Sequence, residues 1–288
     1  MPMPSAASPV DAKAAVRDQW NQAAAGWDAH SPVIRAWLAD ATEAMLDMAD
    51  VQPGSRVLDV AAGAGDQTLD IARRVGPQGY VLATDLSPSI LALAKAHAEH
   101  AGLKQVETRV ADGESLPVAD ASFDAAVCRL GLMFFPEPLR GLEQMHRALR
   151  PGGGICTMVF SRPERNPCVA MLMSTALRHA GLPPRDPYQA GGLLSLGKPG
   201  LIDELFRTAG FHEVATTTVQ APFRLPSAGA YLDFVRTSAS PIQQILGGLS
   251  PQRAEAAWKD MEQRLDAFTT SAGWEGPNEL LLTAARRR

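Results

Sequence analysis

Short apolar runs alternate with helical stretches through the middle of the chain, and this alternation limits the possible folds more than any other feature. Between residues 56 and 160 the apolar runs are RVLDVA, GYVLATD, VETRVAD, FDAAVCRL and GICTMVF. Helical patterns separate them near residues 66–75, 88–101 and 138–149. Strands that alternate with helices predict a parallel sheet covered on both faces and connected by right-handed crossovers.

The alternation is interrupted twice after residue 160. Residues 161–198 are rich in Pro, Gly, Met and Leu, and residues 221–276 contain two helical patterns, so we expect a helical insertion at each place. The strands EVATTTVQ and NELLLTAAR resume the sheet. The prediction is an α/β fold with a doubly wound, Rossmann-like sheet of seven mostly parallel strands, helices on both faces and helical cap insertions.

These boundaries divide the chain into four parts. Residues 1–10 are rich in Pro, Ser and Ala and are expected to be disordered, whereas residues 11–52 have a helical pattern and are expected to form an N-terminal lid. The core comprises residues 53–160, 199–220 and 277–288. The two insertions should form a substrate cap, because insertions in a regular scaffold usually carry specificity. The alternative is that they only cover an edge of the sheet.

Composition argues against several classes of function. The net charge of −4 over 288 residues gives no basic footprint for a nucleic acid. No apolar run reaches the roughly 18 residues of a membrane span, and the first ten residues lack the pattern of a secretory signal. We therefore expect a cytoplasmic protein. The three cysteines have neither the spacing of a metal site nor that of a disulfide framework.

A glycine turn follows the first strand, in the stretch VLDVAAGAGDQT. Gly63 and Gly65 lead into a helix N-terminus, which allows a ligand to approach the backbone. Asp85 ends the next strand at the distance expected of an acid that binds a ribose. Thr68 stands where the dinucleotide fingerprint has its third glycine, so this pattern alone is weak evidence for a nicotinamide cofactor.

Asp59 lies within the first apolar run. A carboxylate in a central strand is costly unless charged or polar groups meet it. The phosphates of a dinucleotide do not match this acid, whereas a ligand with an ammonium or a sulfonium group does. The alternative is that nearby backbone N–H groups satisfy Asp59.

Several ordered blocks together resemble the class I S-adenosylmethionine-dependent methyltransferases, in the group similar to the ubiquinone/menaquinone C-methyltransferases (methyltransferase type 11). The blocks are VLDVAAGAGDQT, ATDLSPSIL, VADGESLPVADASFDAAVC and LRPGGGICTMVF, and the resemblance covers about residues 15–220. It implies an enzyme that moves a methyl group from S-adenosyl-L-methionine to O, C or N of a small, apolar or aromatic metabolite, with S-adenosyl-L-homocysteine as product. The cofactor-binding residues that it implies are Asp59, Ala61, Gly63, Gly65, Asp85, Leu86, Asp112, Gly113, Arg129 and Trp27.

The resemblance also implies which part of the cofactor each residue meets. Asp59 holds the methionine ammonium, directly or through water. Asp85 accepts hydrogen bonds from both ribose hydroxyls, and Leu86 packs on the adenine. Asp112 meets the adenine amine, and Gly113 supplies a backbone contact.

Other interpretations of these residues stay open. Asp85 is alternatively a turn residue before a helix, and Asp112 a loop residue before glycine. Arg129 faces either the cofactor carboxylate or an acidic neighbour. Trp20 and Trp27 are seven residues apart and share a helix face. Trp27 then covers the methionine end as part of a lid, or both rings pack on the core.

One departure from the family pattern concerns the loop after the first strand. Ala61 stands where the family usually has Gly, and Ala62 where it has Gly, Cys or Ser. Alanine fits at each place if φ stays negative.

Methyl transfer is an in-line displacement, and aligning the acceptor with the methyl group supplies much of the rate enhancement. A base is needed only when the acceptor holds its proton firmly. His30, beside the lid, and His179, in the first insertion, are the candidate catalytic bases, although a lone histidine is more often structural. No metal site is expected.

The lid and the insertions should enclose the acceptor. Their apolar residues are Met171, Met173, Tyr188, Leu193, Leu194, Phe223, Tyr231 and Phe234. These suit an apolar acceptor, or they form only the core of the cap. The competing functions are a cofactor-binding protein of the same fold without methyl transfer or with a non-methylating reaction, and a nicotinamide-dependent oxidoreductase. The identity of the acceptor and the oligomeric state are open.

Overall fold

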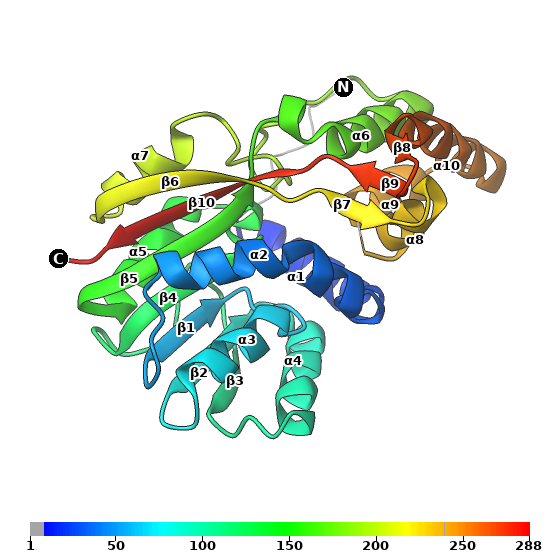
Figure 1. Cartoon of the computed structure of the whole chain (residues 1–288). Coiled ribbons are helices and arrows are strands. Elements are labelled where there is room, and N and C mark those ends of the chain that lie inside the picture. Colours follow the sequence, from blue (N-terminus) through cyan, green and yellow to red (C-terminus); the bar gives the residue numbers. More distant parts are fainter. Residues whose placement is uncertain (1–8, 239) are drawn as a thin grey trace.

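The computed structural model describes residues 9–238 and 240–288, and it contains a seven-stranded sheet with the order β3-β2-β1-β4-β5-β10-β6 (Figure 1). The last strand, β10, runs antiparallel to both of its neighbours, whereas β1 to β5 are parallel. The predicted Rossmann-like sheet is therefore confirmed. Its strands are β1 (Arg56–Val60), β2 (Tyr80–Asp85), β3 (Val106–Val110), β4 (Phe123–Arg129), β5 (Leu149–Phe160), β6 (His212–Gln220) and β10 (Glu279–Arg286).

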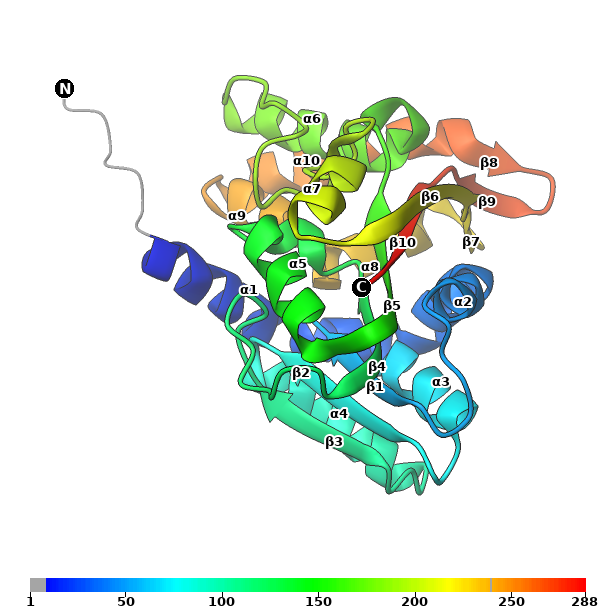
Figure 2. The same ribbon diagram turned by 90° about the vertical axis from the view of Figure 1, so that its left-hand side faces the viewer.

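Helices cover both faces of this sheet (Figure 2). One face carries α2 (Ser31–Met48), α3 (Asp66–Val75) and α4 (Pro88–His100), and the other carries α5 (Pro138–Ala148) and α7 (Leu201–Thr208). The Ser87 side chain caps α4 by accepting a hydrogen bond from the backbone N–H of Ile90, as expected of serine at a helix start. The apolar face of α2 is fully buried on the sheet, including Ile34 and Leu38.

The segment expected to form the lid contains two helices with different surroundings. Helix α1 (Pro9–Ala29) contacts α4 of the core and α8 of the cap, whereas α2 packs on strands β4, β5 and β10. Helix α2 is thus a covering helix of the sheet. Residues 1–8 of the segment expected to be disordered lie outside the described residues, and α1 begins at Pro9, two residues before the predicted helical start.

The cap forms a second lobe with its own core. Its helices are α6 (Pro167–Ala180), α8 (Ala228–Ser238), α9 (Ser240–Gly247) and α10 (Pro251–Leu265). It also contains a small sheet, not predicted, of β7 (Phe223–Leu225), β8 (Thr269–Thr270) and β9 (Gly273–Gly276). These strands are too short to show an alternating pattern. Trp274 of β9 is nevertheless almost fully buried in the cap core.

A two-stranded ribbon joins the cap to the core. Gln220 of β6 pairs with Glu279 of β10 at the edge of the large sheet. One step further Ala221 N donates to Asn278 O at 2.8 Å. The ladder then continues into the cap as β7 paired with β9. Figure 1 shows this ribbon, in yellow and red, running from the core into the cap.

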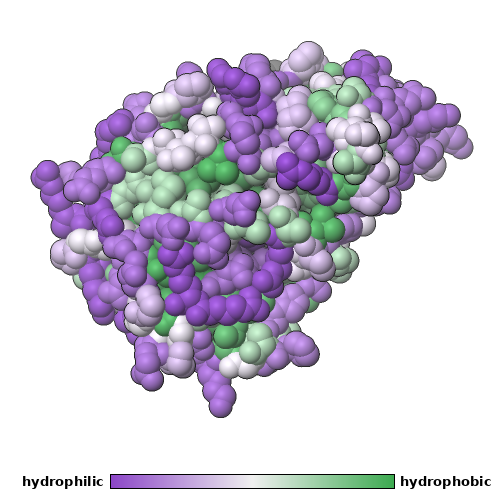
Figure 3. All heavy atoms as spheres, in the orientation of Figure 1, coloured by the Kyte–Doolittle hydropathy of each residue, from purple (hydrophilic) through white to green (hydrophobic). Residues whose placement is uncertain are grey.

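The outer surface is mainly polar at its margins, with an apolar area across the middle of the face in Figure 3. Val110 and Leu182 are the large hydrophobic residues that are exposed in the described part of the chain, so most of this area consists of partly covered side chains. None of the described helices combines the length and apolar character that a membrane span requires.

Candidate functional site

A cavity of about 1040 Å³ lies between the core and the cap, at the carboxyl ends of β1, β2 and β4. Strands β1 and β4 are neighbours here, and the chain winds outward from them in both directions, which is where doubly wound sheets bind ligands. Ligand pockets span roughly 300–1,000 Å³. The volume is therefore enough for a cofactor and a second small molecule.

The loops after β1 and β4 meet closely at the base of the cavity. A Cβ placed on Gly131 would lie 2.4 Å from the Cβ of Ala61. Ala61 has φ of 56° and Leu130 has φ of 54°. The condition under which alanine fits easily, a negative φ, is therefore not met at Ala61. Alanine here has the left-handed conformation that glycine adopts readily, and such residues cost about 1–3 kcal/mol each and cluster at functional sites.

The two glycines of the turn serve different purposes. Gly63 has φ of 59° and leaves room on its Cα, since a Cβ there would approach no atom closer than 3.9 Å. Gly65 has φ of 89°, and a Cβ there would lie 2.8 Å from Ala94 of α4. Gly63 therefore presents backbone to the cavity, and Gly65 allows α3 and α4 to pack.

Asp85 lies on the cavity wall beside this turn. Its Oδ2 accepts a hydrogen bond from Gly63 N at 3.0 Å, and its Oδ1 accepts one from Ser87 N at 2.9 Å. Burial raises the pKa of this carboxyl, although the backbone donors oppose the shift. Each oxygen keeps a lone pair for a ligand hydroxyl. Leu86 follows on the same wall.

Asp59 is completely buried and does not line the cavity. Thr68 Oγ1 donates to its Oδ2 at 2.6 Å and Gln67 Nε2 to its Oδ1 at 3.2 Å. Burial raises its pKa to about 6 despite these bonds. The alternative in which backbone N–H groups satisfy Asp59 is wrong, because side chains do so. Gln67 lines the cavity and donates to Asp59, so it connects the buried carboxylate with the cavity wall.

Asp112 also lines the cavity, and each of its carboxylate oxygens accepts a hydrogen bond. Its Oδ1 accepts a hydrogen bond from Glu114 N at 2.9 Å, and its Oδ2 accepts one from Lys13 Nζ at 2.6 Å. Lys13 also lies 2.5 Å from Glu114 Oε2, as an ion pair without hydrogen-bond geometry. Asp112 is thus both a turn residue and part of the cavity wall. Gly113 is required beside it, since a Cβ there would lie 2.4 Å from the Phe135 ring.

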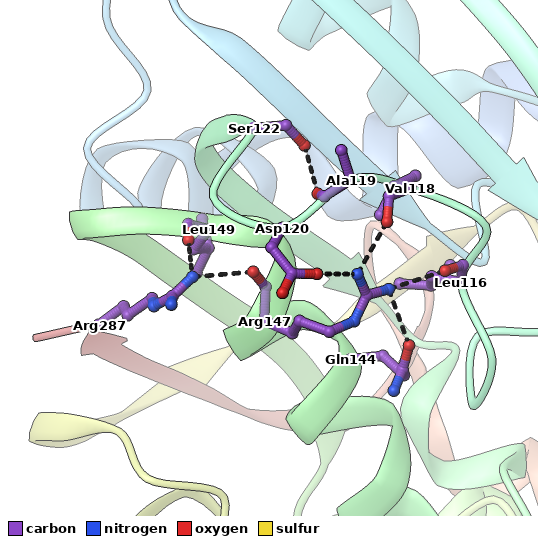
Figure 4. A network of polar contacts seen from close by, with 9 residues as sticks. All are labelled: Leu116, Val118, Ala119, Asp120, Ser122, Gln144, Arg147, Leu149 and Arg287. Atoms are coloured by element: carbon purple, nitrogen blue, oxygen red, sulfur yellow. Dashed lines mark hydrogen bonds and ion pairs between the residues drawn. The ribbon is translucent and has the colours of Figure 1, made fainter.

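Arg147 holds the loop that carries Asp112 (Figure 4). Its Nη2 donates to Leu116 O and its Nη1 to Val118 O, both at 2.8 Å. Arg287, which follows β10, donates to the carbonyls of Arg147 and Leu149. The network ties this side of the cavity to α5 and to the end of β10.

Arg129 is a buried cation on the cavity wall, 8% exposed. Its Nη1 donates to Thr42 Oγ1 at 2.9 Å, and it forms no ion pair with any described residue. Burial lowers its pKa, although the more distant Asp66 and Asp59 oppose the shift. The remaining N–H groups have no protein acceptor among the described residues. Of the two interpretations, an acidic neighbour is therefore not observed, and an anionic ligand fits.

Trp20 and Trp27 of α1 both line the cavity. Their ring centroids are 5.6 Å apart, and Trp27 lies 6.0 Å from Phe234 of the cap. Helix α1 is anchored over the glycine turn by His97, whose Nδ1 is 3.0 Å from Ala64 O and whose Nε2 is 3.0 Å from Asp28. Of the two helices in the segment predicted to form a lid, only α1 has a position that agrees with this interpretation.

The two candidate histidines do not lie on the cavity wall. His30 Nδ1 is 2.8 Å from the Gly26 carbonyl, and the ring packs on the edge of Phe234. His179 Nε2 is 2.8 Å from Asp260 Oδ2 at the contact between α6 and α10. Both side chains are used in packing and structural contacts, and the structure does not bring either of them together with the residues of the cavity wall.

The cavity wall is strongly aromatic. The chain has 9 Phe, 5 Trp and 3 Tyr, and nine of these residues line the cavity: Trp20, Trp27, Trp37, Phe134, Phe135, Phe160, Phe223, Tyr231 and Phe234. Of the eight predicted pocket residues, Met171 and Tyr188 are not on its wall. Asp85, Asp112 and Glu114 are on the core side, and Asp186 is the acid contributed by the cap.

Sequence reasoning missed three polar residues of the site: Lys13, Gln67 and Thr68. Gln67 and Thr68 directly follow the glycine turn in GAGDQT, so their place in the first turn of α3 was available as a signal. Lys13 had none, since it meets Asp112 only through the tertiary fold. No group of three or more metal-ligating side chains is present among the described residues.

Residues 13–176 match the ubiE/COQ5 methyltransferase family. The demethylmenaquinone methyltransferase of Bacillus cytotoxicus is 33% identical over 153 residues, which are 51% of this chain and 63% of that protein. The match thus spans somewhat less than two thirds of the length of this curated relative.

Two solved structures share the fold. The YcgJ protein from Bacillus subtilis has a TM-score of 0.57 and 17% identity, covering 87% of this chain and 99% of its own. Phosphoethanolamine N-methyltransferase 2 of Haemonchus contortus, in complex with S-adenosylhomocysteine, has a TM-score of 0.56 and 15% identity, covering 90% and 58%. At these identities the likeness shows the fold alone. The family match covers more than half of the chain, and this protein therefore belongs to the ubiE/COQ5 methyltransferase family.

Proposed function

We propose that this protein transfers a methyl group from S-adenosyl-L-methionine to O, C or N of a small, neutral, apolar or aromatic molecule. The observation that carries the proposal is that the acids and glycines of the core and the aromatic side chains of the lid and cap line one cavity. Family membership gives the class of reaction, and the composition of the cavity wall gives the class of acceptor.

The residues present fit each part of this cofactor. The carboxylate of its amino acid part matches the unpaired guanidinium of Arg129, and its ammonium matches the Gln67 carboxamide backed by Asp59. The ribose matches Asp85 above the open backbone of Gly63. Adenine matches Leu86 and Asp112, where its amine shares the Asp112 carboxylate with Lys13.

When bound, the cofactor supplies a methyl group already activated by its sulfonium. The chain contributes alignment and exclusion of water. Trp27 and Phe134 lie along the wall that a planar acceptor would contact, and α1 covers the space above the glycine turn. Alignment of two reactants is worth roughly 7–11 kcal/mol of barrier, so the reaction needs no dedicated base when the acceptor loses its proton readily.

Neutral acceptors fit better than cationic ones. An ammonium in the aromatic part of the cavity would rely on the faces of the aromatic rings alone, which compensate its desolvation less completely than a buried carboxylate does. The acids on the cavity wall lie on the core side, apart from Asp186, which is in an exposed loop of the cap. This arrangement favours phenols, enols and activated carbons as acceptors.

Transfer of radiolabelled methyl from S-adenosylmethionine to a panel of neutral phenols, hydroxyquinones and aliphatic amines tests the proposal. We expect labelled product from the aromatic acceptors and none from the amines. Binding of the cofactor without transfer to any member of the panel would instead support the alternative of a cofactor-binding protein. Binding of a nicotinamide dinucleotide in place of S-adenosylmethionine would exclude the proposal.

A further inference from the structure

One hydroxyl in the aromatic part of the cavity has no partner. Tyr231 of α8 is 5% exposed, and its ring centroid lies 5.4 Å from that of Phe223 and 4.7 Å from that of Trp274. Its hydroxyl makes no hydrogen bond with a described residue. It is also not among the four side-chain oxygens of described residues that are fully enclosed without a partner. Tyr231 is one of the residues that line the cavity, so its side chain lies within reach of a molecule bound there.

The other hydroxyls on this part of the wall are already used. Ser174 Oγ donates to Met171 O at 2.9 Å, and Ser238 Oγ donates to the carbonyl of Phe234. The amide nitrogen of Asn278 donates to Gly276 O at 3.2 Å. Tyr231 is thus the hydroxyl here whose hydrogen has no acceptor among the described residues. A buried donor without an acceptor is costly, and a ligand oxygen placed beside it removes that cost.

Tyr231 stands at one end of a row of aromatic rings. Successive ring centroids are 6.4 Å apart from Tyr231 to Phe234, 6.0 Å from Phe234 to Trp27 and 5.6 Å from Trp27 to Trp20. The row ends at Phe134, 5.4 Å from Trp20, in the turn after β4. It therefore leads from the cap to the core side of the cavity, where the cofactor residues lie.

We propose that the Tyr231 hydroxyl donates a hydrogen bond to a carbonyl or ether oxygen at the cap end of a planar, apolar acceptor, and that it selects among acceptors of equal size. The inference rests on the proposed function in that the bound molecule is the methyl acceptor. Tyr231 is a specificity-determining residue and supplies no base. Burial raises the pKa of its phenol, which keeps the hydrogen in place.

Binding of two matched probes tests the inference. Fluorene and 9-fluorenone share a three-ring skeleton and differ by one carbonyl oxygen. Their dissociation constants are measured by calorimetry, with and without saturating S-adenosylhomocysteine, for the wild type, Tyr231→Phe and the control Tyr80→Phe. Tyr80 lies on β2, where its hydroxyl donates to Glu107 at the surface, so the control removes the same group away from the cavity.

We expect the wild type to prefer 9-fluorenone, and Tyr231→Phe to reduce that preference about three- to tenfold, as the loss of one neutral hydrogen bond does. Fluorene should bind both proteins equally, which shows that the cavity is intact in the variant. Tyr80→Phe should keep the wild-type preference.

An unchanged preference in Tyr231→Phe, or an equal loss in Tyr80→Phe, would overturn the inference. Failure of the wild type to bind either probe would overturn it as well. No methyl transfer is measured in this experiment. A protein that shows the Tyr231 effect but transfers no methyl group would contradict the proposed function and leave the binding role of Tyr231 standing.

Discussion

Arg129 is a buried guanidinium that meets a hydroxyl and no carboxylate within ion-pair distance among the described residues. A buried charge usually requires a partner. Asp66 and Asp59 favour the charge of Arg129 only from further away. We therefore expect Arg129 to contribute to the affinity for a ligand carboxylate.

Arg129→Met should therefore weaken binding of S-adenosylhomocysteine by about tenfold to a hundredfold, the scale of a charge-assisted hydrogen bond. The control is a ligand rather than a variant: 5′-methylthioadenosine has the same nucleoside without the carboxylate. Calorimetry should give equal affinities of wild type and Arg129→Met for 5′-methylthioadenosine. Equal losses for both ligands would assign Arg129 a structural role instead.

Asp59 should make stability depend on pH. Because burial raises its pKa to about 6, the folded protein retains a proton that the unfolded chain releases above about pH 4. The free energy of unfolding should thus fall as pH rises from about 4 to 6. Asp59→Asn should remove up to about 3 kcal/mol of this fall. Urea unfolding of the ligand-free protein across this range measures it, and parallel curves for the two proteins would contradict the assignment.

For single residues, the sequence indicated which ones lie in the site better than it indicated their hydrogen-bond partners. The distance from the glycine turn indicated Asp85, and the block VADGESLPVADASFDAAVC, which resembles the family, indicated Asp112. The hydrogen bonds from Thr68 and Gln67 to Asp59 depend on the side-chain rotamers in the first turn of α3. The ion pair of Asp112 with Lys13 joins residues that are 99 positions apart. No local pattern encodes either contact.

Helix α1 is the element on which the cavity depends most. It supplies two tryptophans to the wall and is held to the core through Lys13, which pairs with Asp112 and with the nearly fully buried Glu114. The contact lies at the edge of the adenine part of the proposed site. The position of α1 is therefore coupled to whatever binds Asp112.

Lys13→Met should loosen α1 without unfolding the core. A partly buried ion pair contributes about 1 kcal/mol, so amides of α1 should exchange hydrogen about fivefold faster, whereas those of α5 should be unaffected. Added S-adenosylhomocysteine should slow the exchange of α1 in both proteins. Unchanged exchange in α1, or faster exchange throughout the chain, would contradict this role.

The helices and strands predicted best are those with glycine or another start or stop signal at each end. Helix α3 begins at Asp66 after the glycine turn and ends at Val75 before Gly76, as expected from the pattern. The strands β7 and β9 were missed because they are three and four residues long and are defined by their pairing to each other. Local sequence patterns thus predicted the fold of the core, whereas they did not predict the strands within the cap.

The whole molecule consists of two lobes, each with its own buried core, around one cavity. A ligand in that cavity contacts the core, the lid helix and the cap together. Ligand binding should therefore stabilise the protein as one unit. The second insertion contributes to the same cavity although it begins more than 150 residues after the glycine turn.

S-adenosylhomocysteine at a hundred times its dissociation constant should stabilise the protein by about 2.7 kcal/mol. For a chain of this size that corresponds to a rise in Tm of roughly 5–10 °C. Asp85→Ala should lose most of this rise at the same concentration, because the ribose hydrogen bonds contribute about 1.5–3 kcal/mol. Differential scanning calorimetry measures both, and an equal rise in Asp85→Ala would argue against ribose binding there.

The ribbon that joins β6 to β7 and β9 to β10 has a consequence for how such proteins diversify. The chain leaves the large sheet at Gln220 and returns at Glu279, and these two residues are direct partners in the ladder. The segment between these two residues therefore leaves the large sheet and returns to it at the same place. A segment with that property can be exchanged for one of another length, since loop closure costs little more as a loop grows. The register of the sheet, and with it the cofactor side, would be unchanged. The part of the cap between these two residues, which excludes α6, is thus attached to the large sheet at a single place.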